Sequence, residues 1–184
     1  MRLDKPRIEP LPEGEWDEEL RPTLEPTRAI GRGKVPNVLA TIARHPKLLK
    51  RWNTFGNHVL FKSTLPPRDR EILILRVGWL CRAEYEWGQH VVIGRRVGLS
   101  DDDIARIREG PEAPGWSPFD AALVRAADEL HADAFVSDDT WKTLAAGYDT
   151  RQMMDVVFTV GQYTVVSRAL NSFGVQHDPG IEGF

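Results

Sequence analysis

Apolar residues recur at three- and four-residue spacing over most of this chain, and that spacing is typical of amphipathic helices. The pattern begins near Asn37 and continues to Gly174, with prolines and glycines between the segments. No segment shows the strict alternation of apolar and polar residues that a half-buried strand requires. The sequence therefore predicts an all-α fold.

Start and stop signals divide this region into separate helices. Asn37 is placed to cap a short first helix, which ends before Pro46 begins a second one. Gly174 is the expected C-terminal stop of the last helix. Further helix starts are predicted at Pro67, Ser100, Ser117, Ser137 and Asp149.

The last long helix, residues 150–173, is expected to be central because residues 156–166 are apolar on nearly every side. Tyr163, Ser167 and Asn171 form one polar stripe along it at four-residue spacing. This stripe is suited to line a pocket. It is also suited to satisfy backbone groups or to contact a second subunit, which is the more common role of such a stripe, and both interpretations stay open.

Residues 1–36 hold six of the thirteen prolines, a composition that disfavours helix interiors. We expect an extended arm that lies over the body of the protein or over a neighbouring subunit, with Trp16 and Leu20 as anchors. Disorder of the arm in solution is the alternative. The predicted division is an arm (1–36), a helical domain (37–176) and a short tail (177–184).

Composition narrows the class of protein. The 24 basic and 27 acidic residues give a net charge of −3, which does not favour nucleic acid or an anionic membrane as a partner. No apolar run approaches the ~18 residues of a membrane span, and no secretory signal is recognised. A single cysteine, Cys81, forms no internal disulfide, so we expect a cytoplasmic protein.

The segment 68–98 carries the most suggestive polar residues, in a predicted helix, elbow and second helix. Glu86 and His90 are four residues apart and therefore share one helical face. Glu71 adjoins the apolar run 72–75, where a carboxylate needs a partner or a proton. Together these three side chains are suited to general acid/base chemistry, or to a buried structural hydrogen-bond network.

Other chemistry has weaker support. A metal site would need a further histidine near Glu71, Glu86 and His90, so we predict neither metal nor cofactor. Cys81 has no second thiol and is expected to be a small apolar filler. The glycines at 31 and 33 do not follow a strand, so no phosphate-binding loop is indicated.

The motif residues resemble the carboxymuconolactone decarboxylase family, which also contains the alkylhydroperoxidase D proteins. The resemblance covers about residues 36–176, and the matching stretches are Arg70-Glu71, Leu75-Arg76-Val77, Tyr85-Glu86-Trp87 with His90, and Gly161-Gln162-Tyr163 to Leu170-Asn171. It implies an alkylhydroperoxidase D-like helical bundle. It also implies self-association into a trimer or hexamer, possibly built from dimers, with a neighbouring chain completing the pocket.

One branch of that family is excluded by this sequence. Its peroxidases carry Cys-x-x-Cys, and the two cysteine positions correspond here to Ala83 and Glu86. A peroxidase or disulfide cycle requires both a peroxidatic and a resolving thiol. We therefore do not expect peroxidase activity.

The remaining branch acts on small carboxylated lactones and dienes from aromatic-compound breakdown, without a cofactor. The resemblance implies decarboxylation, a double-bond shift or cis–trans isomerisation by proton transfer. His90 would shuttle the proton because imidazole titrates near working pH, while Glu86 orients it and Glu71 completes a relay. Substrate contacts are predicted for Tyr85, Trp87, Tyr163, Asn171 and, as carboxylate clamps, Arg76 or Arg168.

Two alternatives stay open. The Glu71, Glu86 and His90 cluster can be a structural lock in a non-catalytic oligomeric binding protein. A thiol-dependent reductase using Cys81 is the second. A cavity at His90 with Tyr163 facing it would favour an enzyme, and a sealed cluster would favour the lock.

Overall fold

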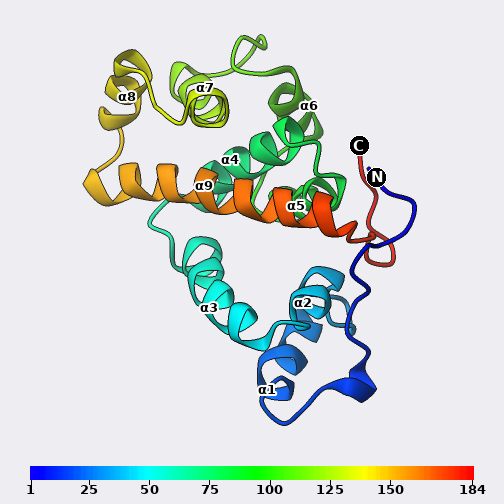
Figure 1. The fold of residues 1–184 in the computed structure, drawn as a ribbon. Helices are drawn as coiled ribbons and strands as arrows, with labels where there is room; N and C mark the ends of the chain where they lie inside the picture. Colours follow the sequence, from blue (N-terminus) through cyan, green and yellow to red (C-terminus); the bar gives the residue numbers. More distant parts are fainter.

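The computed structural model describes residues 1–184 and consists of helices and connecting segments, without a strand (Figure 1). This confirms the predicted all-α class. No helix combines the length and the apolar content that a membrane span needs. The main helices are α1 (Arg21–Leu24), α2 (Asn37–Ile42), α3 (Pro46–Asn57), α4 (Pro67–Leu80), α5 (Glu84–Arg96), α6 (Asp101–Glu109), α7 (Pro118–Asp133), α8 (Asp138–Ala145) and α9 (Thr150–Phe173).

Helix α4 is the centre of the molecule and packs against α5, α7 and α9. Its four consecutive apolar residues, Ile72 to Leu75, are all fully buried, so every face of this helix meets protein. The long helix α9 crosses α4, and α7 and α8 lie toward its N-terminal end (Figure 1). The burial of apolar surface around α4 fixes the helix that carries Glu71.

Side-chain caps define several helix starts as the sequence predicts. Ser100 with Asp103, and Asp149 with Gln152, each form a reciprocal capping box. Gly174 ends α9 with φ = 70°, in the left-handed region that glycine adopts without strain. These local signals explain why the boundaries of α6 and α9 could be read from the sequence.

The predicted cap of α2 is wrong. Asn37 is the first residue of α2 and makes no cap bond to it. Its side-chain amide instead donates to the backbone carbonyls of Gln176 and His177, at 3.0 and 3.3 Å. The Asn37 side chain is therefore bonded to the C-terminal tail and does not cap α2.

The N-terminal segment is more regular than an extended arm. Helix α1 runs directly into a 3₁₀ turn, η2 (Glu25–Ala29), and an earlier 3₁₀ turn, η1, covers Glu13–Glu15. Each of α1 and η2 places a proline in its first turn, where the missing N–H costs nothing. Trp16 and Leu20 are buried as expected, in a small apolar cluster with residues of α2 and α3.

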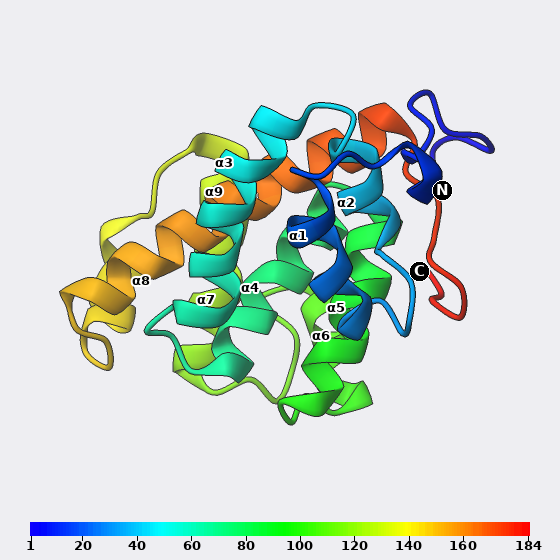
Figure 2. The ribbon, with the colours of Figure 1, turned by 90° about the horizontal axis from the view of Figure 1, so that it is seen from below.

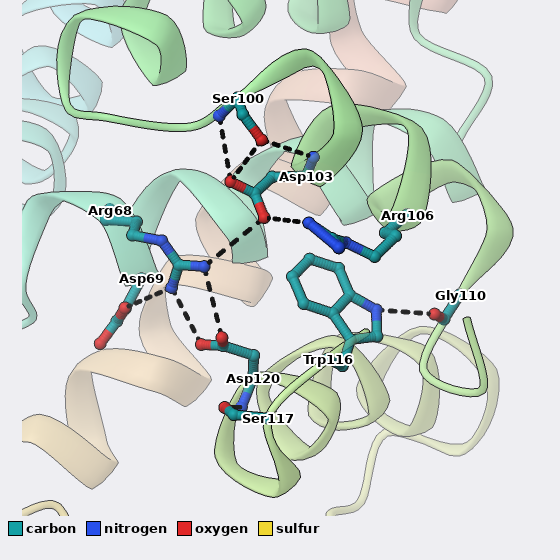
Figure 3. Close-up of polar contacts among 9 residues, drawn as sticks. All are labelled: Arg68, Asp69, Ser100, Asp103, Arg106, Gly110, Trp116, Ser117 and Asp120. Atoms are coloured by element: carbon teal, nitrogen blue, oxygen red, sulfur yellow. Dashed lines mark hydrogen bonds and ion pairs between the residues drawn. The ribbon is translucent and has the colours of Figure 1, made fainter. Parts of the chain in front are cut away.

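A polar network fixes the N-terminal end of α4 to its neighbours (Figure 3). Arg68 donates to both carboxylate oxygens of Asp120 in α7, at 2.9 and 3.3 Å, and lies 3.8 Å from Asp103 in α6. The Tyr148 hydroxyl donates to Asp69 at 2.6 Å. These bonds orient the first turn of α4 and with it the position of Glu71, one turn further on.

Both termini lie at the same side of the molecule, near the start of α5 (Figures 1 and 2). The C-terminal tail packs so closely on α5 that a Cβ on Gly88 would collide with the backbone carbonyl of Glu182. The Phe184 ring contacts Trp79 and Trp87 edge-on, with centroids 4.8 and 5.8 Å away. The tail is thus part of the packed structure.

Candidate active site

Glu71, His90 and Glu86 form one continuous hydrogen-bonded row between α4 and α5. The Nδ1 atom of His90 lies 2.6 Å from Glu71 Oε2, and its Nε2 atom lies 3.0 Å from Glu86 Oε1. All three side chains are buried. Arg70 completes the row by donating from Nε and Nη2 to Glu71 Oε1, at 3.1 and 3.0 Å.

The two carboxylates determine the protonation of His90. Burial alone lowers the pKa of the imidazole, but the negative charges of Glu71 and Glu86 and their hydrogen bonds raise it to about 10. His90 is therefore an imidazolium at neutral pH, and each ring N–H donates to a carboxylate. The raised pKa argues against the expectation that His90 titrates near working pH, because a free imidazole lacks these flanking charges.

Tyr163 of α9 contacts the imidazolium through its ring. The two rings meet edge to face, with centroids 4.9 Å apart and planes at 86°. Burial, followed by the charge of Glu86, raises the pKa of Tyr163 well above its usual value. The phenol therefore stays protonated and can donate a hydrogen bond to a ligand.

A cavity of about 520 Å³ opens beside this row. Glu86, His90 and Tyr163 line it, together with Gln162, Gln89 and other residues of α5 and α9. The remaining wall comes from α1, η2, α2, α3 and the π-helical turn η3 (His58–Lys62). The cluster is therefore open to a ligand-sized space, which distinguishes it from a sealed structural lock.

Tyr85 lines the same cavity, but its hydroxyl is held by the protein. It donates to Asp178 Oδ2 at 2.7 Å and accepts from the backbone N–H of Val38 at 3.3 Å. Gln89 donates to the same Asp178 oxygen at 2.5 Å. Tyr85 is thus a fixed wall residue whose phenolic proton is already engaged.

Arg76 does not reach the cavity, which corrects its predicted role as a carboxylate clamp. Its guanidinium bonds both oxygens of Asp128 at 2.5 and 2.9 Å, and the carbonyls of Ile107 and Arg108 at 2.8 and 2.9 Å. Arg76 therefore fastens α4 to α6 and α7. Arg168, the other predicted clamp, is exposed on α9 and is not among the residues lining the cavity.

Trp87 and Asn171 also lie outside the cavity, contrary to the prediction. Trp87 is buried in the main apolar core, against Trp79. Asn171 donates to the backbone carbonyl of Cys81 at 2.8 Å and so ties α9 to the elbow between α4 and α5. The predicted polar stripe of α9 is therefore divided, with Tyr163 at the cavity and Asn171 in a structural contact.

Cys81 lies at the elbow, away from the cavity. Its sulfur is 3.7 Å from Nδ1 of His131, and burial raises the pKa of the thiol. A raised pKa keeps the sulfur protonated and weakens it as a nucleophile, which disfavours the thiol-dependent alternative. No group of three or more His, Cys, Asp or Glu side chains is arranged to hold a metal ion.

Sequence reasoning missed several cavity residues. Gln162 adjoins Tyr163 in the matched motif, so its proximity could have been inferred from that neighbour. Trp52 and Asn53 come from α3, which no local motif connects to Glu86. Asp178, which holds Tyr85 and Gln89, belongs to the tail, and only the folded structure shows its contacts.

The fold is shared with solved alkylhydroperoxidase D-like structures. A peroxidase-related protein with an AhpD core from Ralstonia eutropha JMP134 superposes with a TM-score of 0.82 at 18% identity, over 94% of this chain and 92% of that chain. One from Silicibacter sp. TM1040 gives 0.76 at 19% identity, over 95% and 90%. A cysteine-to-alanine variant of the debrominase Bmp8, bound to 2,3,4-tribromopyrrole, gives 0.78 at 14% identity, over 94% and 91%.

The fold of this chain is therefore alkylhydroperoxidase D-like. Residues 46–129, which include Glu71, Glu86 and His90, match the carboxymuconolactone decarboxylase family, over a little less than half of the chain. This confirms the resemblance read from the motif residues. No curated protein matches the chain.

Proposed function

We propose that this protein is a cofactor-independent acid/base enzyme that transfers a proton next to a carbonyl group of a small unsaturated molecule. The observation that carries the proposal is the hydrogen-bonded row of Glu71, His90 and Glu86, which ends at a cavity large enough for a ring compound. The match to a family named for a decarboxylase, and the fold shared with a debrominase, support an enzyme.

Glu86 is the general base in this proposal. Its Oε1 accepts from His90, and its Oε2 makes no hydrogen bond within the protein. This second oxygen would take a proton from a carbon next to the substrate carbonyl, and the C–H electron pair would move toward the carbonyl oxygen. Tyr163 would donate a hydrogen bond to that oxygen as it gains negative charge.

His90 would act as a fixed cation in this scheme, in place of the shuttle expected from the sequence. Its two N–H groups hold Glu71 and Glu86 in place, and its charge stabilises the row. Return of the proton from Glu86 to a different carbon completes a double-bond shift. A decarboxylation would start differently: Glu86 would take the proton of a substrate carboxylic acid, the electron pair of the bond to the leaving carbon dioxide would move toward the carbonyl oxygen, and the proton would return to that carbon. Rotation in the enolate stage gives cis–trans isomerisation.

The metabolic role, the location and the assembly of the protein are also proposals. A role in aromatic-compound catabolism, a cytoplasmic location and a trimeric or hexameric assembly all follow from the resemblance or from composition. The non-catalytic binding protein is the second candidate function. The cavity itself is compatible with both candidates, so turnover is the property that separates them.

We expect the protein to exchange carbon-bound hydrogen with solvent in at least one unsaturated lactone or ring-cleavage product. Incubation in D₂O followed by proton NMR would detect the exchange, and ultraviolet absorbance would follow any change in conjugation. Glu84→Gln is a suitable control, because Glu84 belongs to α5 but contacts the chain N-terminus outside the cavity. Binding of such compounds with no exchange and no absorbance change would contradict the enzyme and favour the binding protein.

A further inference from the structure

The cavity contains few charged groups for one that would receive a carboxylate. Apart from its two tyrosines, the ionisable residues lining it are Glu86 and His90. No lysine or arginine is among the lining residues. The other polar lining side chains are neutral, namely Thr23, Thr27, Asn53, Asn57, Gln89 and Gln162.

The charge of His90 is already balanced. Its two N–H groups donate to Glu71 and Glu86, and Arg70 bonds the second oxygen of Glu71. The row therefore contains two cations and two carboxylates. An anion entering the cavity would meet the Glu86 carboxylate and find no cation free to compensate it, so its desolvation would be unfavourable.

The apolar part of the wall is suited to a ring. Trp52, Leu60, Ile93 and Val166 line the cavity, and they remove apolar ligand surface from water. The polar features beside them are complementary to a neutral ligand. Glu86 offers an acceptor oxygen, and Tyr163 offers a donor hydroxyl.

From this arrangement we propose that the cavity selects an uncharged ring compound and rejects its carboxylate counterpart. The ligand would present a hydrogen-bond donor or an acidic C–H to Glu86 and a carbonyl oxygen to Tyr163. This inference rests on the proposed function, because it assigns the substrate class of the same site. It replaces the carboxylated substrate that the family resemblance implies, and of the reactions proposed above it favours the double-bond shift and the cis–trans isomerisation over the decarboxylation.

A matched pair of ligands tests the inference. 2-Naphthamide and 2-naphthoate have nearly the same shape and differ in charge, and isothermal titration calorimetry at pH 7.5 measures both affinities. We expect the amide to bind on the order of 100-fold more tightly, because the carboxylate meets a like charge in a partly desolvated cavity. Equal affinities, tighter binding of the carboxylate, or no binding of either compound at millimolar concentration would overturn the inference.

A cation introduced into the wall provides the reciprocal test. Asn53→Arg should increase the affinity for 2-naphthoate by about 10-fold or more. It should not increase the affinity for 2-naphthamide, because the amide carries no charge. Asn53→Gln is the control, since it changes the length of the side chain without adding charge. An equal effect of the two variants on 2-naphthoate would contradict the electrostatic account.

These measurements separate the inference from the proposed function. Binding of naphthamide requires no proton transfer, so the preference for the neutral ligand can hold even when no compound is turned over. That result would remove the enzymatic proposal and leave the assignment of ligand charge. Turnover of carboxylated substrates combined with preferential binding of 2-naphthoate would support the enzymatic proposal and overturn the assignment of a neutral ligand.

Discussion

Glu86→Gln should reduce kcat by about 10³-fold once a substrate is in hand, because general acid/base groups typically contribute 10²–10⁴-fold. Glutamine has nearly the same shape, and its carbonyl oxygen can still accept from His90 Nε2. It cannot take a proton from carbon. The affinity for a neutral ligand should therefore change much less than kcat, and steady-state kinetics with calorimetric binding would separate the two effects.

The control for this experiment is Glu84→Gln, which removes a carboxylate from the same helix outside the cavity. Its kcat should stay within about 2-fold of the wild type, because Glu84 contacts the chain N-terminus and does not line the cavity. A Glu86→Gln enzyme with nearly wild-type kcat would refute the role of Glu86 as base. Loss of kcat in both variants would point to a general disturbance of α5.

His90→Gln should destabilise the protein by about 3–5 kcal/mol at pH 7, the range measured when one partner of a buried ion pair is removed. Without the imidazolium, the buried carboxylates of Glu71 and Glu86 lose the cation between them. Arg70 still compensates Glu71, which leaves Glu86 as the less compensated charge. Urea unfolding monitored by circular dichroism would measure the difference in free energy of unfolding.

The pH dependence of this difference has a definite sign. The pKa of His90 is raised from 6.5 to about 10 in the folded protein, so folding favours the protonated imidazole. The stabilisation is fully present below about pH 6.5 and is lost as the pH rises through 10. The gap between wild type and His90→Gln should therefore narrow from pH 7 to pH 10. A gap that widens over this range, or a His131→Gln control with the same profile, would contradict the explanation.

Much of the fold could be predicted because its signals are local. The capping boxes at Ser100 and Asp149 and the glycine at 174 depend on residues within a few positions of each other. Asn37 shows the limit of such signals, since its side chain bonds carbonyl groups about 140 residues away. The short helices at residues 21–29 are likewise not predicted by the sequence, because a proline is compatible both with the first turn of a helix and with an extended arm.

The catalytic candidates could be predicted for a similar reason. Glu86 and His90 share a face by spacing alone, and Glu71 was conspicuous as an acid beside an apolar run. The substrate contacts were harder, because the partner of a side chain depends on which helix packs against its face. Arg76 forms an ion pair with Asp128, and Trp87 packs in the apolar core, so neither side chain reaches the cavity.

The charge on His90 differs from the expectation for a free imidazole, and it changes the chemistry proposed for the site. Spacing indicated that two carboxylates and an imidazole converge, but the distances show that both carboxylates bond the same ring. Two such contacts in a buried site favour the imidazolium and make Glu86 the residue that faces the ligand with a basic oxygen. The reaction would then depend on a carboxylate that a fixed cation holds in place.

The most direct test of this account is the protonation state of His90 in the folded protein. Nitrogen-15 NMR of the imidazole ring, recorded from pH 6 to pH 10, reports whether each ring nitrogen carries a proton. We predict that both nitrogens stay protonated through pH 8, with a titration midpoint near the pKa of about 10. A midpoint near 6.5, with one nitrogen unprotonated at pH 8, would contradict the carboxylate–imidazolium row and the assignment of Glu86 as base.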